Sequence, residues 1–160
     1  MPLFNIIGMT LIAVGGLVLA LMLNKMAEQE LNEATSWVEV LKYITDQVSV
    51  FAMPISEIIS KCDRELLLSC GIDRDYASES SFKLLVQRRR SHSKENQKII
   101  CAFAESFGKN DRSEQIRECE YYTRLMESRR SALAEKLPKQ KKINFTLCIS
   151  SALALIIILI

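Results

Sequence analysis

Charged side chains are absent from both ends of the 160-residue chain, although they make up 25% of the whole. Residues 1–24 and 143–160 contain no Asp, Glu, Lys or Arg, so the 21 basic and 19 acidic residues all lie between Lys25 and Lys142. This distribution excludes a simple soluble globule, and two apolar ends are too few for a multi-pass transporter. It predicts a charged module, residues 25–142, between two membrane anchors, residues 1–24 and 143–160.

The two apolar runs have the lengths that membrane-spanning helices need. Residues 3–23 would form a helix of about 31 Å and residues 143–160 one of about 27 Å, against a hydrocarbon core of about 30 Å. A cleaved signal peptide is the alternative for the first run, but residues 1–5 lack the basic side chain that such peptides carry. Small residues spaced four apart favour close packing of the spans, at Gly16 with Ala20 and at Ser150 with Ala154.

Lysines flank the two spans only on the side of the module. Lys25 follows the first span, and Lys136, Lys139, Lys141 and Lys142 precede the second. Because Lys and Arg concentrate on the cytoplasmic side of membrane helices, the module is expected in the cytoplasm. Five cysteines without a CxxC pair are then expected to be reduced, buried thiols; the reverse orientation would allow two disulfides.

Glycine and proline are scarce in the module, which contains only Gly71, Gly108, Pro54 and Pro138. This scarcity argues against a turn-rich β fold, and apolar residues recur at helical spacing. We therefore predict an all-α fold: a cytoplasmic bundle of about five helices flanked by N- and C-terminal transmembrane helices. The module's helices are expected at residues 25–52, 54–70, 81–91, 94–107 and 111–137, with a loop at 73–80.

The first of these helices is predicted to bury Trp37, Ile44 and Phe51 beside its apolar face. It should end at a break formed by Pro54 and Ile55, because proline suits the first turn of the next helix. Ile116, Cys119, Tyr122, Met126 and Leu133 mark the inner side of the last.

The two halves of the module have opposite net charge. Residues 25–80 contain 5 basic and 11 acidic side chains, whereas residues 81–142 contain 16 basic and 8 acidic. The halves could neutralise each other within one bundle, or an acidic face of the first half could meet a basic partner. The sequence leaves both open.

Residue patterns typical of enzymes are missing. His92 is the single histidine, and there is no Gly-rich phosphate loop, Gly-x-Ser-x-Gly elbow or HExxH motif. We expect no catalytic activity, cofactor or metal. Residues 88–90, with Lys83 and Lys94, should form a solvated basic face; a protein partner or anionic lipid is the alternative. Nucleic acid is not expected, because no aromatic residues are interleaved.

The most distinctive segment runs from residue 103 to residue 115. A helix is expected to end at Gly108, and Asp111 with Glu114 forms a plausible capping box for the next. One interpretation is a corner between two helices with a structural role only. The other is that the corner is a docking point for a partner.

At this segment the chain resembles the stage III sporulation protein AB family of endospore-forming bacteria. The matching positions are Phe103, Glu105, Gly108, Asp111, Arg112 and Gln115, while Ala104 and Phe107 replace a glycine and a leucine. A second match is the helix break at Pro54 and Ile55, where Met53 replaces the family's usual threonine.

The resemblance implies a non-enzymatic part of the channel between mother cell and forespore, placed in the mother-cell membrane around the forespore. The module would be similar to the cytoplasmic domains of the type II secretion platform protein (the F component). Its expected partners are the other membrane proteins of the sporulation channel and the apparatus's cytoplasmic ATPase, with homo-oligomers left open. A membrane-bound adaptor or regulator of a signalling partner is the rival interpretation.

Overall fold

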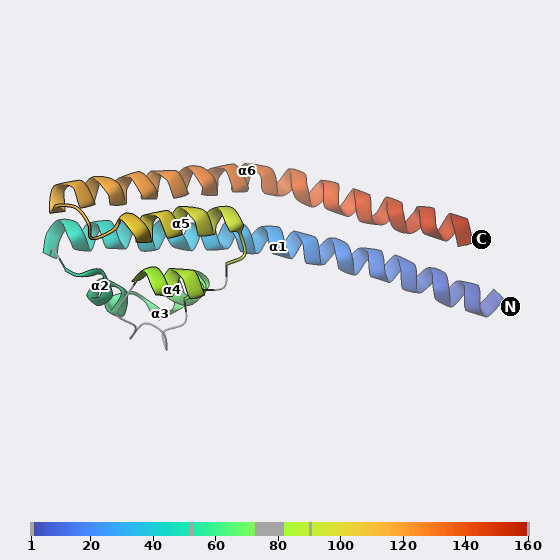
Figure 1. The fold of residues 1–160 in the computed structure, drawn as a ribbon. Helices are drawn as coiled ribbons and strands as arrows, with labels where there is room; N and C mark the ends of the chain where they lie inside the picture. Colours follow the sequence, from blue (N-terminus) through green and yellow to red (C-terminus); the bar gives the residue numbers. More distant parts are fainter. Residues whose placement is uncertain (1, 52, 73–81, 90, 160) are drawn as a thin grey trace. The chain divides into compact units, whose positions relative to one another are not determined.

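The computed structural model describes residues 2–51, 53–72, 82–89 and 91–159, and within these ranges the chain forms six helices and no strand. The predicted all-α class is therefore confirmed (Figure 1). The helices are α1 (Pro2–Phe51), α2 (Ile55–Lys61), α3 (Arg64–Ser69), α4 (Phe82–Arg88), α5 (Lys94–Ser106) and α6 (Arg112–Leu159). The loop predicted at residues 73–80 lies outside the described residues.

Among the described residues, two helices are long and apolar enough, by length and composition, to cross a membrane. α1 joins the first apolar run to the first helix of the module without interruption, and α6 does the same for the second run. The predicted end near Leu137 is wrong, because Pro138 lies inside α6. An internal proline removes one hydrogen bond, whereas ending the helix would leave several carbonyls without intrahelical donors.

The chain divides into two compact units. We call Met1–Gln29 with Ala134–Ile160 the anchor unit, and Glu30–Leu133 the core unit. Each contains one part of α1 and one part of α6.

The anchor unit is an antiparallel helix pair packed through small residues. Ala20 is fully buried, and a Cβ atom built on Gly16 would come within 3.0 Å of Ala152 and 3.2 Å of the Cys148 carbonyl. The prediction that Gly16 and Ala20 lie where the two apolar segments pack closely is thus confirmed. The matching prediction for α6 is wrong, because Cys148 and Ala152 face α1 while Ser150 and Ala154 are exposed.

The chain between α1 and α4 differs from the single helix that was predicted. Pro54, which is extended with φ −65° and ψ 147°, directly precedes α2. The expected helix over residues 54–70 breaks after Lys61, because Asp63 caps a new helix by accepting a hydrogen bond from the Glu65 N–H at 2.9 Å. Gly71, at φ 78°, follows the end of α3, where a residue in the left-handed region commonly ends a helix.

The core unit has one hydrophobic core, to which every helix of that unit contributes. Trp37 and Ile44 of α1 are fully buried as predicted, but Phe51 is 59% exposed. The predicted inner side of α6 is confirmed, with Cys119 and Met126 buried and Ile116, Tyr122 and Leu133 partly buried against the core. α5 occupies its predicted position to within one residue at each end, whereas α4 ends at Arg88, three residues before the predicted end.

We predict that Gly16→Ala destabilises the anchor unit by about 1–2 kcal/mol, because an added methyl group overpacks the contact with Ala152. Gly15→Ala is the matched control: a Cβ atom there meets nothing within 4 Å, so the substitution should be neutral or stabilise the helix by about 0.5–1 kcal/mol. The measurement is thermal unfolding of both full-length variants in the same detergent. Equal shifts would contradict this packing.

Candidate functional site

A fully buried ion pair lies in the core unit. The Glu33 and Arg89 side chains are both 0% exposed, and the Arg89 Nη1 group donates to Glu33 Oε1 at 2.6 Å. The same nitrogen also donates to the Cys70 carbonyl at 2.9 Å. Burying charge is costly unless the charges are paired and hydrogen-bonded, so this pair ties α1 to the ends of α3 and α4.

Glu33 has further donors from the link between α4 and α5. The Ser91 hydroxyl donates to Oε1 at 2.8 Å, and the His92 backbone N–H donates to Oε2 at 2.6 Å. The His92 ring is 46% exposed, with Nδ1 3.4 Å from Oε2. One carboxylate on α1 therefore fixes the path of the chain into α5.

The guanidinium of Arg89 also stacks on Trp37, with its central carbon 4.9 Å from the ring centroid. Among the described residues, Arg89 Nε and Nη2 and Trp37 Nε1 are buried without an acceptor. Stacking and the ion pair, rather than complete hydrogen bonding, thus hold this guanidinium.

Glu30, one turn before Glu33, extends the polar contacts to α5 and α6. Its Oε1 accepts from the Ser93 hydroxyl at 2.7 Å and from Arg129 Nη2 at 2.6 Å. Asn96 Nδ2 donates to its carbonyl at 3.2 Å. At the start of α5, the backbone hydrogen bond at Glu95 lowers the pKa of that carboxyl, and the Ser93 hydroxyl and Arg129 lower it further. Glu30 and Glu33 therefore connect α1 to the link between α4 and α5, to α5 and to α6, and through Arg89 also to the end of α3.

These contacts bear on the question of charge segregation. Glu30 and Glu33 belong to the acidic half, and their partners Arg129 and Arg89 belong to the basic half. In the anchor unit, Lys141 likewise donates to Glu28. At these three positions the two halves neutralise each other within the chain.

The prediction of a solvated basic face is wrong for one of its residues. Arg88 and Lys94 are exposed, but Arg89 points into the core, and residue 90 lies outside the described residues. Lys83 forms an exposed ion pair with Glu105 at 3.2 Å. Glu33 was not predicted from the sequence. Its position four residues before Trp37, on the apolar face of α1, could have indicated that it is buried.

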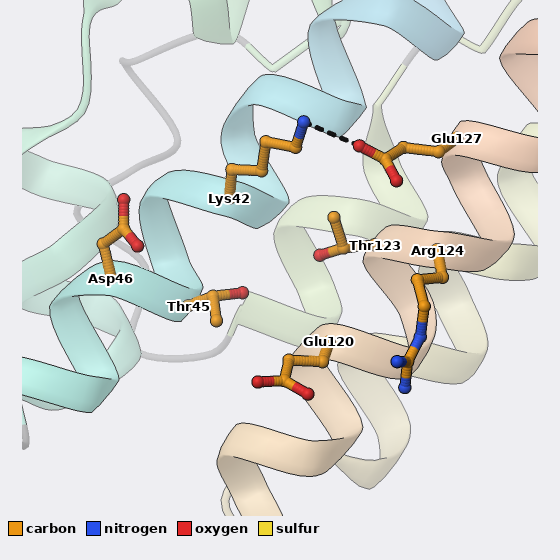
Figure 2. A pocket seen from close by; sticks show the side chains of 7 residues that line it. All are labelled: Lys42, Thr45, Asp46, Glu120, Thr123, Arg124 and Glu127. Atoms are coloured by element: carbon orange, nitrogen blue, oxygen red, sulfur yellow. Dashed lines mark ion pairs between the residues drawn. The ribbon is translucent and has the colours of Figure 1, made fainter.

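A shallow groove of about 310 Å³ lies between α1 and α6 of the core unit. Figure 2 shows Lys42 of α1 reaching across it to Glu127 of α6, at 2.6 Å. The hydrogen bond from Lys42 lowers the pKa of Glu127. The hydroxyls of Thr45 and Thr123 donate to carbonyls of their own helices at 2.7 Å, so neither is poised as a nucleophile. The groove's other lining residues are Asp46, Glu120 and Arg124.

The corner between α5 and α6 combines buried and exposed parts. Phe103 is fully buried, with its ring centroid 5.9, 5.3 and 5.5 Å from those of Phe82, Phe107 and Tyr122. It therefore belongs to the core rather than to a docking surface. Gly108, at φ 82°, makes the turn.

The polar residues of the corner have separate roles. Arg112 donates to the Ser49 carbonyl near the end of α1. Asp111 begins α6 by accepting from the Glu114 N–H at 3.3 Å, which is half of the predicted capping box. Gln115 is half-buried, whereas Glu105 and Asp111 are exposed. The predicted helix break at Pro54 and Ile55 takes no part in these corner contacts. Pro54 is exposed, and Ile55 is partly buried against the core.

The five cysteines are free thiols, and four of them are buried. Burial raises the pKa of Cys119 to about 12 and that of Cys70 well above its ordinary value. Both thiols are therefore protonated at neutral pH and poor nucleophiles. Within the described ranges, no group of three His, Cys, Asp or Glu side chains could hold a metal ion.

Within the described residues, fold and site together define an α-helical protein with two candidate membrane helices and a core unit organised around one buried ion pair. The chain belongs to the stage III sporulation protein AB family, because that family's model matches residues 77–160, just over half of its length. The match includes the α5–α6 corner and all of α6, but not Pro54 and Ile55. No curated protein and no solved structure gives a match.

We predict that Glu33→Ala destabilises the protein by about 3–5 kcal/mol, because it leaves the Arg89 charge buried without its partner. Glu57→Ala, which removes an exposed ion pair with Lys61, should cost no more than about 0.5 kcal/mol. Chemical denaturation of the full chain in detergent, followed by circular dichroism, measures both. The double variant Glu33→Leu with Arg89→Met should recover much of the loss. If it loses as much as Glu33→Leu alone and Arg89→Met alone added together, the pair is not coupled.

Proposed function

We propose that this protein is a non-enzymatic, membrane-anchored component of the channel between mother cell and forespore, and that it docks the channel's cytoplasmic ATPase to the membrane. The observation that carries the proposal is the family match over residues 77–160, since membership gives the chain a role in sporulation. The two apolar helices support the anchoring part of the proposal.

The proposed orientation places the core unit in the cytoplasm. Lys25 and the lysines at residues 136–142 all lie on the core-unit side of the two apolar segments, and lysines that flank membrane helices concentrate on the cytoplasmic side. The same orientation exposes the core unit to a cytoplasmic partner. The mother-cell membrane around the forespore is the location that the family's role in sporulation suggests.

We assign docking to the exposed rim of the α5–α6 corner. Its structural residues, Phe103, Gly108 and Arg112, present the outer side chains in a defined arrangement. Glu105 and Glu114 are exposed there and hold none of the core contacts. Exposed carboxylates held in place by a packed helix corner suit recognition of a partner, because electrostatic complementarity provides specificity.

We expect the pair Glu105→Lys and Glu114→Lys to weaken capture of the ATPase by roughly tenfold or more, because two charges in the contact are reversed. The measurement is co-purification of the ATPase with the full-length chain from membranes, with spore formation in a deletion strain as the second readout. Asp111 is left intact because its carboxylate caps α6.

The matched control is Glu39→Lys with Glu57→Lys. Like the test pair, it replaces two exposed glutamates by lysines, removes one exposed ion pair and puts a lysine into the first turn of one helix. This control should keep both capture and spore formation. If both pairs behave alike, the corner is only a structural turn; normal spores without the gene would overturn the proposed function itself.

We predict that a cysteine at position 109 is shielded from an impermeant maleimide in intact cells and is labelled after permeabilisation. Lys109 is an exposed residue of the corner, whereas native Cys62 and Cys119 are too buried to report topology. The background carries Cys101→Ala, since that thiol is half-buried. In cells that express the chain without sporulating, so that the outer face of the membrane meets the medium, a cysteine appended after residue 160 should be labelled without permeabilisation. Labelling of position 109 in intact cells would reverse the orientation.

A further inference from the structure

The anchor unit has an excess of positive charge. It contains five lysines, at positions 25, 136, 139, 141 and 142, and only two glutamates, at positions 28 and 135. Glu28 is bonded to Lys141, and Glu135 is 3.6 Å from Lys139, with both of those side chains more than 70% exposed. An exposed pair of this kind contributes little free energy, so Lys139 can exchange Glu135 for another anion.

Helical geometry separates these lysines into two groups. Because α6 continues through Pro138, its residues keep a spacing of about 100° around the helix axis. Lys136, Lys139 and Lys142 then lie on one arc of about 120°, which we call the lysine arc, and Lys141 lies outside it. The structure agrees, since Lys141 reaches Glu28 on α1 whereas the three members of the lysine arc are exposed.

The lysine arc lies at the edge of the apolar segment. Residues Lys142, Lys139 and Lys136 precede Ile143, the first residue of that segment, by about 1.5, 6 and 10 Å along the helix. Lipid headgroups occupy a layer of roughly 5–7 Å on each side of the hydrocarbon core, and lysine side chains extend several ångströms. The whole arc is therefore within reach of headgroup phosphates.

Lys25 of α1 lies at the same depth. The Asn144 side-chain N–H donates to Asn24 Oδ1 at 3.2 Å, which aligns α1 and α6 at the end of their apolar segments. Lys25 follows Asn24 directly and is exposed, so it adds a fourth exposed ammonium group to the same layer.

We propose that the lysine arc, together with Lys25, binds the phosphate groups of anionic phospholipids and gathers these lipids around the anchor unit. Lysines beside a span also direct its insertion, but that role needs no exposed arc on the folded helix. Basic side chains this close to an anionic surface each strengthen binding several-fold. The inference goes beyond docking and uses only the membrane-spanning part of the proposed function.

The experiment places the full-length chain in phosphatidylcholine bilayer discs that carry trace spin-labelled phosphatidylglycerol or spin-labelled phosphatidylcholine. Electron paramagnetic resonance measures the fraction of each lipid immobilised by the protein. The wild-type chain should prefer phosphatidylglycerol by roughly threefold or more. Lys136→Gln with Lys139→Gln and Lys142→Gln should bring the preference close to one.

Lys94→Gln with Lys98→Gln and Lys109→Gln is the control, because it removes the same charge from exposed lysines of the core unit. It should keep the preference, and an equal loss in both triple variants would overturn the proposal. Inorganic phosphate that abolishes the preference, when chloride of equal ionic strength does not, would assign the arc to a free anion instead. If no lipid of either kind is immobilised, the anchor function fails as well.

Discussion

The core unit depends on one interaction, the buried pair of Glu33 and Arg89. Neither side chain is exposed, and each would be costly to bury without the other. Because their partners include the Cys70 carbonyl, the Ser91 hydroxyl and the His92 N–H, the pair forms only when α1, the end of α3 and the α4–α5 link are all in place. The hydrophobic core could tolerate small shifts between these segments, whereas hydrogen bonds of 2.6–2.9 Å cannot.

The two units share the helices α1 and α6. Neither helix breaks where one unit passes into the other, so backbone hydrogen bonding continues from the apolar segments into the core unit. Pro138 is the local weak point of α6, since it has no N–H to donate to the Ala134 carbonyl four residues earlier. Pro138 lies four residues after Ala134, where the α6 part of the anchor unit begins.

Sequence periodicity predicted correctly which side of a helix is buried where apolar residues repeat. It failed where a polar side chain determines a helix end or is itself buried. Cys119 and Met126 were correctly placed inside because they follow the helical spacing. The break between α2 and α3 was missed because it depends on Asp63 as a cap within an otherwise apolar pattern. Arg89 was misjudged because three consecutive arginines resemble a solvated face, and its acceptor Glu33 lies 56 residues away in the sequence.

By itself, the sequence determined the all-α class, the two uncharged apolar segments, the helix break at Pro54 and the family, because these follow from local composition and short motifs. Only the tertiary structure decided which charges are partners. Glu28, Glu30 and Glu33 pair with lysine and arginine residues that are 56 to 113 positions distant. Net charge gives no information about such pairing, because the energy of a charge depends on its burial and its nearest neighbours. Both are properties of the folded chain.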